Sequence, residues 1–337
     1  MKPVTSTIYE VAKRAGVSTA TVSRTLRGTA PVANETRERV LAAVDELRFT
    51  PSRLARSLSE GSHAANGIVF PDLSGPYFAE VILAYEEAAA ELGRSVLILS
   101  TNGREAPAAM FADLASRVDG LVVLGRTVSD GVLLQLADKG IPLVVMARES
   151  LVWADSVNAE NDTSARELTS HLVVDHGYRS LEFLGDVAGS CDVLERWRGF
   201  HRALTDHAIA GPAEAVTCAL SEEGGRVAAL QLLAERPPRA LVCANDEIAL
   251  GATLAAEELG LRIPEDLAIT GWDDVMAARH SRPGLTTVRQ PMRALGGWAA
   301  RRLHERLSGD TSEPRHEVLP TQLVRRASCG PHPEENA

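Results

Sequence analysis

The sequence predicts a small all-α N-terminal domain followed by a larger α/β core of two similar lobes. Three observations support this fold class. Three short helical patterns occupy the first 50 residues, and apolar runs alternate with helical patterns from about residue 66 onward. Only 4% of the 337 residues are aromatic, whereas Ala, Leu and Val are abundant, as is usual where helices pack on parallel strands. The length also suggests two or three domains.

The N-terminal helices have recognisable ends. A capping box at Thr7–Glu10 begins the first helix, because the Thr7 hydroxyl can accept from the Glu10 amide while the Glu10 carboxylate reaches back. Gly16 ends this helix, Ser18 can cap a second over residues 19–26, and a third is expected at about 34–47. Helices this short are marginal alone, so they must share one core. The third helix is expected to bury Val40, Leu41, Val44 and Leu47.

A short linker separates this domain from the core. Pro51 blocks continuation of the third helix, and Ser52–Leu58 has a helical pattern that ends before Gly61. Such a segment can be helical or disordered, depending on its surroundings. The expected domains are therefore residues 1–50, a linker at 51–61 and a core at 62–337.

The core shows two series of unbroken apolar runs separated by helical patterns. Such runs indicate parallel sheets covered on both faces. Two series predict two lobes, at about 64–158 and 159–328, with a ligand cleft between them. The expected strands lie at 68–70, 96–99, 121–124, 143–146, 181–184, 216–218, 240–243 and 267–269. The expected helices lie at 77–92, 106–117, 130–139, 163–175, 192–207, 223–235 and 246–259.

The net charge of −10 is unevenly distributed. The first 60 residues carry ten basic and six acidic side chains, whereas the remainder carries 25 and 39. A basic head on an acidic body suits a chain in which one small region meets a polyanion. The N-terminus lacks an apolar signal-peptide core and no run reaches about 18 apolar residues, so we expect neither secretion nor a membrane span. A cytoplasmic protein is expected.

The remaining chemistry-bearing residues predict no catalysis. The four cysteines stand far apart without a CxxC pair, which favours a reducing compartment and no disulfide framework. The pairs His171 and His176, and His201 and His207, have no nearby set of residues that resembles a metal-ligand cluster, so we expect solvated histidines and no metal. No GxSxG motif, P-loop or GxG phosphate loop occurs. The sequence therefore predicts neither an enzyme nor a cofactor.

The strongest motif spans Ile8–Leu26. A helix, a turn at Gly16 and a second helix that opens with small polar residues have the form of a helix-turn-helix, whose second helix contacts base edges in the major groove. Arg24 could pair with guanine, and Ala20 could lie against a thymine methyl group. The spacing alone also allows a plain helical hairpin.

The segment TIYEVAKRAGVSTATVSRTLRG closely resembles the headpiece of the LacI/GalR family of bacterial repressors, as does VANETRERVLAAVDELRFTP. The resemblance continues in family order through GIVFPDLSGPYFAE, RVDGLVVLG, CANDEIALGA, GLRIPEDLAITGWDD and LTTVRQP. It implies a helix-turn-helix headpiece on a two-lobed core like that of periplasmic binding proteins. It also implies a transcriptional repressor that binds a pseudo-palindromic double-stranded DNA operator as a homodimer and responds to a small effector, a sugar by the family's habit.

The resemblance assigns the DNA contacts position by position. Phosphate-contacting or positioning residues match Thr7, Ser18, Ser23 and Thr36. Base-reading residues match Thr19, Ala20 and Arg24, while Arg27 stands where the family often has Asn. Asn34 is expected to cap the third helix in place of the Ser that commonly stands at position 33. The linker matches the family's hinge helix, in which Leu58 would wedge into the minor groove beside Ala55 and Arg56.

The resemblance also implies an effector pocket between the lobes. One side matches Asp72, Tyr77 and Phe78, and the other matches Ser190, Arg196, Asn245 and Asp273. These residues suit a polyhydroxylated ligand, because they combine oriented donors and acceptors with an aromatic face. Two departures prevent the assignment of a particular effector. Met146-Ala147-Arg148 lacks an Asp that members often have, and Leu220 lies near a position often held by an aromatic residue.

Two other classes of protein remain as alternatives. A sugar-binding transport protein would share the two lobes but would need an export signal and no helix-turn-helix. An α/β enzyme would need a catalytic set in the cleft. For a repressor, we expect release of DNA on effector binding rather than corepression. We also expect a dimer, because the tail after Arg326 lacks leucine heptads.

Overall fold

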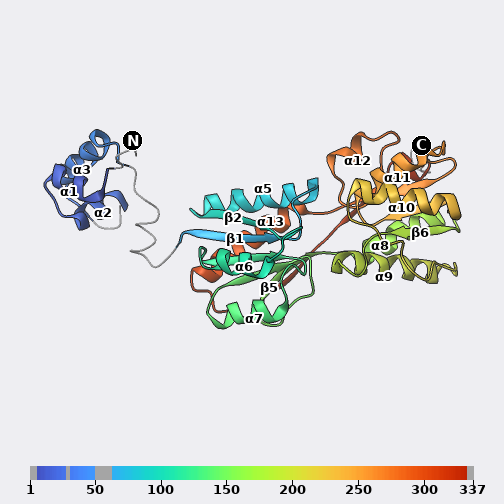
Figure 1. The fold of residues 1–337 in the computed structure, drawn as a ribbon, viewed down its shortest axis with the longest axis horizontal. Coiled ribbons are helices and arrows are strands. Elements are labelled where there is room, and N and C mark those ends of the chain that lie inside the picture. The colour runs from blue at the N-terminus through green and yellow to red at the C-terminus, as the bar shows by residue number, and fades with distance from the viewer. Residues whose placement is uncertain (1–5, 28–30, 50–62, 332–337) are drawn as a thin grey trace. The chain divides into compact units, whose positions relative to one another are not determined.

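The computed structural model describes residues 6–27, 31–49 and 63–331, and Figure 1 shows its elements. By internal contacts the chain divides into two compact units, residues 1–64 and 65–337. The whole of the predicted linker at 51–61, including Ala55, Arg56 and Leu58, lies outside the described residues. Within the described part, no helix has the length and apolar character needed to cross a membrane.

The first unit contains the three predicted helices, α1 (Ile8–Ala15), α2 (Thr19–Arg27) and α3 (Asn34–Glu46), drawn in blue in Figure 1. The capping box is present: the Glu10 amide donates to Oγ1 of Thr7 (3.3 Å) and the Thr7 amide donates to Oε2 of Glu10 (2.7 Å). Gly16 ends α1 with a left-handed φ of 67°, which a residue without Cβ adopts freely. The shared core is formed by Val11, Ala12, Ala15, Val22, Val40 and Ala43.

Two expectations for α3 are wrong. Leu41 is 44% exposed, because it lies one position after Val40 and points away from the face that buries Val40 and Ala43. Ala33 occupies the N-cap position and makes no side-chain capping bond, so Asn34 is the first helical residue and not the cap.

The N-terminal lobe of the core is a six-stranded parallel sheet with the order β10-β5-β4-β3-β1-β2. Its strands are β1 (Ala65–Phe70), β2 (Ser95–Ser100), β3 (Gly120–Leu124), β4 (Leu143–Met146), β5 (Asp155–Ala159) and β10 (His316–Leu319). Its helices are α5 (Pro76–Glu91), α6 (Pro107–Ala115), α7 (Asp130–Asp138) and α13 (Met292–Leu307).

Alternation along the strands divides the packing of this sheet between two helical layers. Ile68 and Phe70 pack with α5 and α13, whereas Val69 packs on the side of α6 and α7. Figure 1 shows the same layers, with α5 and α13 on one face and α6 and α7 on the other. The two helices α5 and α13 approach closely at Gly296, where an added Cβ would lie 2.3 Å from the carbonyl oxygen of Val81.

The C-terminal lobe is built on a parallel sheet of β6 (Leu181–Leu184), β7 (Ala240–Cys243) and β8 (Ala268–Thr270), in that order. Its helices are α8 (Asp162–Val174), α9 (Cys191–Asp206), α10 (Glu222–Glu235), α11 (Asp246–Glu258) and α12 (Met276–His280). An antiparallel pair, β9 (Thr287–Arg289) and β11 (Gln322–Val324), and a short 3₁₀ turn, η1 (Ala327–Cys329), complete it. The strand expected at 216–218 is a single bridge between Val216 and Leu184.

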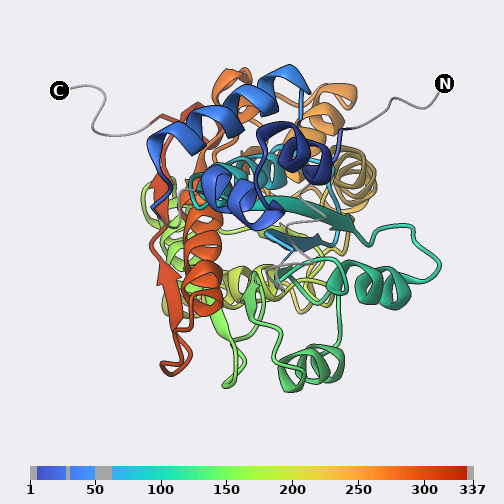
Figure 2. The same ribbon diagram turned by 90° about the vertical axis from the view of Figure 1, so that its left-hand side faces the viewer.

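The expected division of the lobes at residue 159 is wrong for one segment. The segment Met292–Leu319 lies in the N-terminal lobe, because α13 packs on α5 and β10 pairs with β5. Figure 2 shows this segment, red in the figure, with helix and strand next to each other. The chain therefore passes between the lobes at three places, near Asn161, Gln290 and Thr321.

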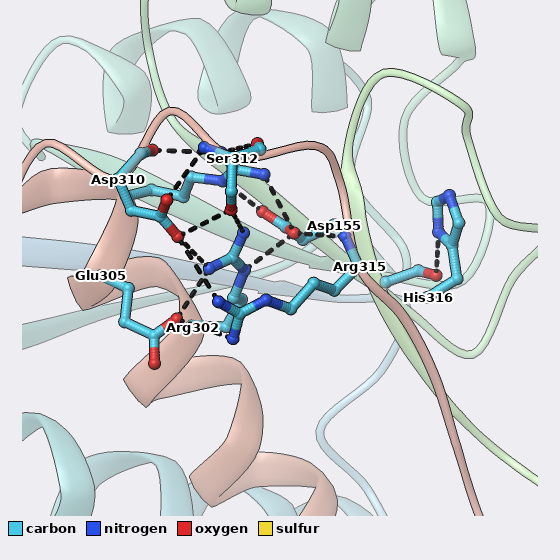
Figure 3. Close-up of polar contacts among 9 residues, drawn as sticks. Asp155, Arg302, Glu305, Asp310, Ser312, Arg315 and His316 are labelled. Atoms are coloured by element: carbon cyan, nitrogen blue, oxygen red, sulfur yellow. Dashed lines mark hydrogen bonds and ion pairs between the residues drawn. The ribbon is translucent and has the colours of Figure 1, made fainter.

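A buried ion-pair network fastens this returning segment to β5 (Figure 3). Nε of Arg302 lies 2.8 Å and Nε of Arg306 2.6 Å from the carboxylate of Asp155, which also accepts from the amide of Arg315 (2.8 Å). Burial would raise the pKa of Asp155, but these bonds outweigh it and the pKa lies below its usual value. Asp310 and Glu305 bond the same arginine, Arg302, from its outer side.

Candidate functional site

A cavity of about 510 Å³ lies between the two lobes, at the carboxyl ends of their parallel strands. This is where open α/β sheets usually bind ligands. The cavity is lined from the N-terminal lobe by residues that follow β1 to β4 and from the C-terminal lobe by residues that follow β6 to β8. Six of the seven predicted effector residues are in this lining: Tyr77, Phe78, Ser190, Arg196, Asn245 and Asp273.

The seventh predicted residue, Asp72, is absent from the lining. Its Oδ1 accepts from the amides of Leu73 (2.6 Å) and Ser74 (3.0 Å), and its Oδ2 accepts from Nδ2 of Asn102 (2.7 Å). These bonds lower the pKa of Asp72, the Ser74 amide having the largest effect. In this structure Asp72 organises the turn between β1 and α5.

Arg196 of α9 is the most firmly held group in the cavity. Its Nε donates to Oδ1 of Asn161 (2.8 Å) and its Nη1 donates to the carbonyl oxygen of Ala244 (2.7 Å). Its guanidinium carbon lies 4.6 Å from the ring centroid of Trp272, a cation–π distance. Asp192 lies beside it, with Oδ2 3.9 Å from Nη2. The guanidinium is therefore buried, oriented and ready to bind a ligand acceptor without reorganisation.

Asp273 supplies an unusual carboxyl group. It follows β8 with a φ of 117°, a conformation that L-residues rarely adopt, and its Oδ1 accepts from Nε2 of Gln290 (2.6 Å). Burial raises its pKa to about 7, so near neutrality this group can donate as well as accept a hydrogen bond. Oε1 of Gln290 is buried without a hydrogen-bond partner among the described residues. Together, Asp273 and Gln290 offer a donor and acceptors side by side.

Asn245 and Ser190, two of the predicted effector residues, also cap helices. Asn245 is the N-cap of α11, because its Oδ1 accepts from the amide of Ile248 (2.9 Å). Ser190 is the N-cap of α9, and its Oγ accepts from the amide of Val193 (3.4 Å). Both residues line the cavity, but the capping bonds already engage their side-chain oxygens.

The N-terminal lobe provides the aromatic wall. The rings of Tyr77 and Phe78 meet edge to face at 5.2 Å, and Phe78 meets Phe70 in the same way at 5.6 Å. Burial raises the pKa of Tyr77 far above its usual value, so its hydroxyl stays protonated. These rings can pack against the apolar face of a ligand while the opposite lobe provides the polar contacts.

One contact across the cleft was not predicted from the sequence. Sγ of Cys191, from the C-terminal lobe, donates to Oε2 of Glu149 (3.0 Å), which is ion-paired with Arg126 in the N-terminal lobe. The bond from Arg126, followed by that from Cys191, lowers the pKa of Glu149 to about 2. No motif marked these residues, because they come from three separate segments. Gln290, by contrast, lies in the LTTVRQP motif, from which it could have been chosen.

The structure shows where the two departures from the family pattern lie, at Met146-Ala147-Arg148 and at Leu220. Ala147 lines the cavity with a small side chain near the position where family members often have an Asp. Arg148 is buried outside the cavity lining and donates to the carbonyl oxygens of Gly125 and Val128 (3.2 Å each). Leu220 also lines the cavity and presents an aliphatic side chain near the position where an aromatic residue is often found.

In the first unit, most of the predicted DNA-contact residues lie on α2 or just before it, whereas Thr7 precedes α1 and Thr36 lies in α3. Ser18 Oγ accepts from the amide of Thr21 (3.2 Å), which makes Ser18 the cap of α2. Ala20 and Arg24 are exposed, one turn apart, and Nε of Arg24 donates to the carbonyl oxygen of Ala20 (3.3 Å). Thr19, Ser23 and Thr36 are half-buried, and Thr7 is exposed at the start of α1. The side chain of Arg27 and the hinge residues Ala55, Arg56 and Leu58 lie outside the described residues.

Comparison with known proteins agrees with both units. Residues 7–52 match the family of bacterial regulatory proteins called the lacI family, and residues 170–329 match the periplasmic binding protein-like domain. The HTH-type transcriptional repressor PurR of Erwinia tasmaniensis is 36% identical over 342 residues, which cover 97% of this chain and 98% of that protein.

Solved structures show the same two-part architecture. The lac repressor dimer bound to operator and an anti-inducer matches with a TM-score of 0.86 and 30% identity, over 97% of this chain and 100% of that chain. A complex of the transcriptional regulator CelR with cellobiose matches with a TM-score of 0.72 and 28% identity, over 96% and 99%. The resemblance therefore extends over nearly the whole of each chain.

Proposed function

The chain belongs to the lacI family of bacterial regulatory proteins, and from that premise we propose that a sugar bound in its core cavity controls how tightly its headpiece holds an operator. The chain is a transcriptional repressor with a helix-turn-helix DNA-binding domain and an effector-binding core. The identity of the effector, the contacts with DNA and the direction of the response are the proposed parts.

The observation that carries the sugar proposal is that Arg196 and Asp273 line the same cavity as the aromatic rings of Tyr77 and Phe78. A sugar hydroxyl both donates and accepts, and Arg196, Asp273 and Gln290 offer a fixed donor, a group that can do either and a buried free acceptor. A volume of about 510 Å³ lies within the usual range of ligand cavities, about 300–1,000 Å³. The structural neighbour CelR was solved in complex with cellobiose, which is a sugar.

For DNA binding, we propose that α2 enters the major groove. Thr19, Ala20 and Arg24 would read bases, because two of them are exposed and all three lie on the first two turns of the helix. Thr7, Ser18, Ser23 and Thr36 would contact or position phosphates, with Arg27 beside them, while the hinge would add Ala55, Arg56 and Leu58 at the operator centre. A repressor of this kind would work in the bacterial cytoplasm.

A homodimer is the proposed DNA-binding form, since the lac repressor neighbour was solved as a dimer on its operator. In this chain β2 is the edge strand of the larger sheet, and Ile98 on β2 and Leu83 on α5 are each 46% exposed. We propose that a second copy covers this face. Sedimentation should give a dimer for the parent and a monomer for Ile98→Asp; a stable tetramer would contradict the proposal.

The proposed switch acts through the places where the chain passes between the lobes. Arg196 bonds Asn161 at one passage, and Asp273 bonds Gln290 at another. At the third, Oγ1 of Thr321 donates to the carbonyl oxygen of Glu160 (2.9 Å). A ligand that engages Arg196 and Asp273 therefore acts on two hinge segments at once. We propose that the resulting change in lobe geometry weakens DNA binding, with a coupling of about 1–3 kcal/mol.

The test is a panel of sugars, sugar phosphates and purine bases, scored by the melting temperature of the full chain. A ligand present at about 100 times its Kd stabilises the fold by about 2.7 kcal/mol, a rise of a few degrees. The proposal expects one sugar to raise the melting temperature and to weaken operator binding in fluorescence anisotropy. The sugar assignment would be overturned if only purines raised the melting temperature, or if no compound in the panel raised it. Tighter operator binding in the presence of the sugar would overturn induction.

A further inference from the structure

We infer that His171, His176 and Cys329 form a zinc-binding site in the C-terminal lobe. His171 is buried, so the expectation of a solvated side chain is wrong for this residue, and the proposal departs from the expected absence of a metal. No local motif marks this site, because Cys329 lies 158 residues after His171 and reaches it only through the fold. His171 lies in the last turn of α8, His176 follows that helix, and Cys329 ends η1.

The separations between the ligand atoms are those of a metal site. Nε2 of His171 lies 3.2 Å from Nε2 of His176 and 3.6 Å from Sγ of Cys329. A tetrahedral zinc ion, with Zn–N near 2.05 Å and Zn–S near 2.3 Å, holds two nitrogens about 3.3 Å apart and a nitrogen and a sulfur about 3.6 Å apart. One ligand atom from each residue lies within 4.8 Å of the other two, so binding requires a closure of about 1 Å.

The second nitrogen of His171 is held by a carboxylate. Nδ1 lies 2.6 Å from Oδ2 of Asp175, which favours a proton on Nδ1 and leaves the lone pair of Nε2 pointing at His176 and Cys329. That single lone pair faces two neighbours, and one metal ion can bind all three groups at once. The Sγ atom of Cys329 also lies 3.0 Å from Oγ1 of Thr286, a contact that a zinc-bound thiolate can keep by accepting from the hydroxyl. Zinc-bound histidines commonly donate their other ring nitrogen to a carboxylate in this way.

The segment that carries Cys329 is already fixed in place. The hydroxyl of Tyr178, whose ring stacks on His176 at 5.4 Å, donates to the carbonyl oxygen of Cys329 (2.8 Å). Oγ of the preceding Ser328 donates to the carbonyl oxygen of Ile269 in β8 (2.6 Å). Because of these supporting bonds, Cys329 is already held in position before an ion binds.

Accessibility fits a bound ion with one open position. His171 and Cys329 are buried, whereas His176 is only half-buried, so the ion can enter past this ring. Three protein ligands leave the fourth position of a tetrahedral zinc ion for water. A bound ion would join the end of α8 to the last turn of the described chain and would stabilise the fold, because the unfolded chain cannot present this site.

The experiment uses the full chain, stripped with a chelator and titrated with zinc chloride. Calorimetry is expected to give one zinc ion per chain, together with a rise in melting temperature. Substitution with cobalt is expected to give the sulfur-to-cobalt charge-transfer band of a thiolate ligand and the visible bands of a tetrahedral ion. These spectra report the ligands directly, independently of any effect on stability.

The variants His176→Gln and Cys329→Ser separate the ligands from their controls. Each should weaken zinc binding at least tenfold, and Cys329→Ser should remove the charge-transfer band. Asp175→Asn should weaken binding by about 10- to 100-fold, because it frees the ring of His171. His201→Gln and Cys218→Ser, in the same lobe but outside the cluster, should bind zinc like the parent. Absence of the thiolate band in the parent, or unchanged zinc binding in both ligand variants, would overturn the inference.

Discussion

Oδ1 of Asn161 accepts a hydrogen bond of 2.8 Å from Nε of Arg196, and this bond connects the cavity to a segment that joins the two lobes. Asn161 lies between β5 of the N-terminal lobe and α8 of the C-terminal lobe. Because Gln290 stands in a second such segment and donates to Asp273, Arg196 and Asp273 are each bonded to a segment that joins the lobes. In the proposed switch, ligand binding acts on the lobes through these two hydrogen bonds.

The first prediction concerns Arg196. Arg196→Lys keeps the positive charge but loses the planar fork that holds Asn161 and the carbonyl oxygen of Ala244. A hydrogen bond to a charged group contributes about 1.5–3 kcal/mol, so affinity for the sugar found in the panel should fall by about 10- to 100-fold. Isothermal titration calorimetry measures this. Arg166→Lys, an exposed arginine paired with Asp206 on the surface, is the control, and equal losses in both variants would contradict the role of Arg196.

The second prediction concerns pH. Burial raises the pKa of Asp273 to about 7 in the folded chain, against 3.8 for an ordinary Asp. Between these values the folded state binds more protons than the unfolded state, so the contribution of Asp273 to the free energy of unfolding falls as pH rises and then levels off. Asp273→Asn lacks this titration. The stability of the variant relative to the parent should therefore increase from about pH 4 to about pH 7.

Urea unfolding across that pH range tests this prediction, with Asp266→Asn as the control. The side-chain bond from Arg262 lowers the pKa of Asp266 to about 2, so Asp266 stays ionised throughout the range. Its substitution should change stability by an amount that varies by only about 0.3 kcal/mol over this range, because only the unfolded-state carboxyl begins to titrate near pH 4. A stability difference between parent and Asp273→Asn that is equally constant would show that Asp273 does not titrate there.

What the sequence predicted of the fold was mostly local. The capping box at Thr7 and the apolar runs that became β1, β3, β4 and β7 are encoded by neighbouring residues, and the structure confirms them. The strand β10 could not be found in this way, because His316–Leu319 is short and three of its four residues are exposed. Only its pairing with β5 makes it a strand, and that pairing joins residues about 160 positions apart.

For the cavity, the resemblance supplied positions but not the use of each side chain. It assigned Asp72 to the cavity, yet the amides of Leu73 and Ser74 bind its carboxylate in a turn. Cys191 was missed, because its contact with Glu149 depends on how the two lobes meet. The stacking of Arg196 on Trp272 likewise arises from tertiary packing, which no local pattern encodes.

The third prediction concerns the returning segment. Arg302 and Asp155 are each 2% exposed in their side chains and lie 2.8 Å apart. Arg302→Met leaves the carboxylate of Asp155 buried with one cation fewer, and breaking a buried pair costs about 3–5 kcal/mol. Urea unfolding should show a loss of this size. Arg315→Ala, whose side chain is exposed, should cost at most about 1 kcal/mol, and similar losses in both variants would mean that burial of the pair does not matter.

The fourth prediction concerns Arg24, whose exposed side chain leaves α2 from the face opposite the core residue Val22 and donates to the carbonyl oxygen of Ala20 one turn earlier. Arg24→Ala should therefore leave the headpiece folded. If Arg24 reads a base, operator affinity should fall by about 1–3 kcal/mol, while affinity for a scrambled duplex changes less. A duplex that the parent protein has selected from random sequences serves as the operator in fluorescence anisotropy at fixed salt. Arg14→Ala, which removes a surface pair with Glu46, controls for the loss of one positive charge. An equal loss on both duplexes would assign Arg24 to a phosphate rather than a base, because phosphate contacts weaken binding to every sequence alike.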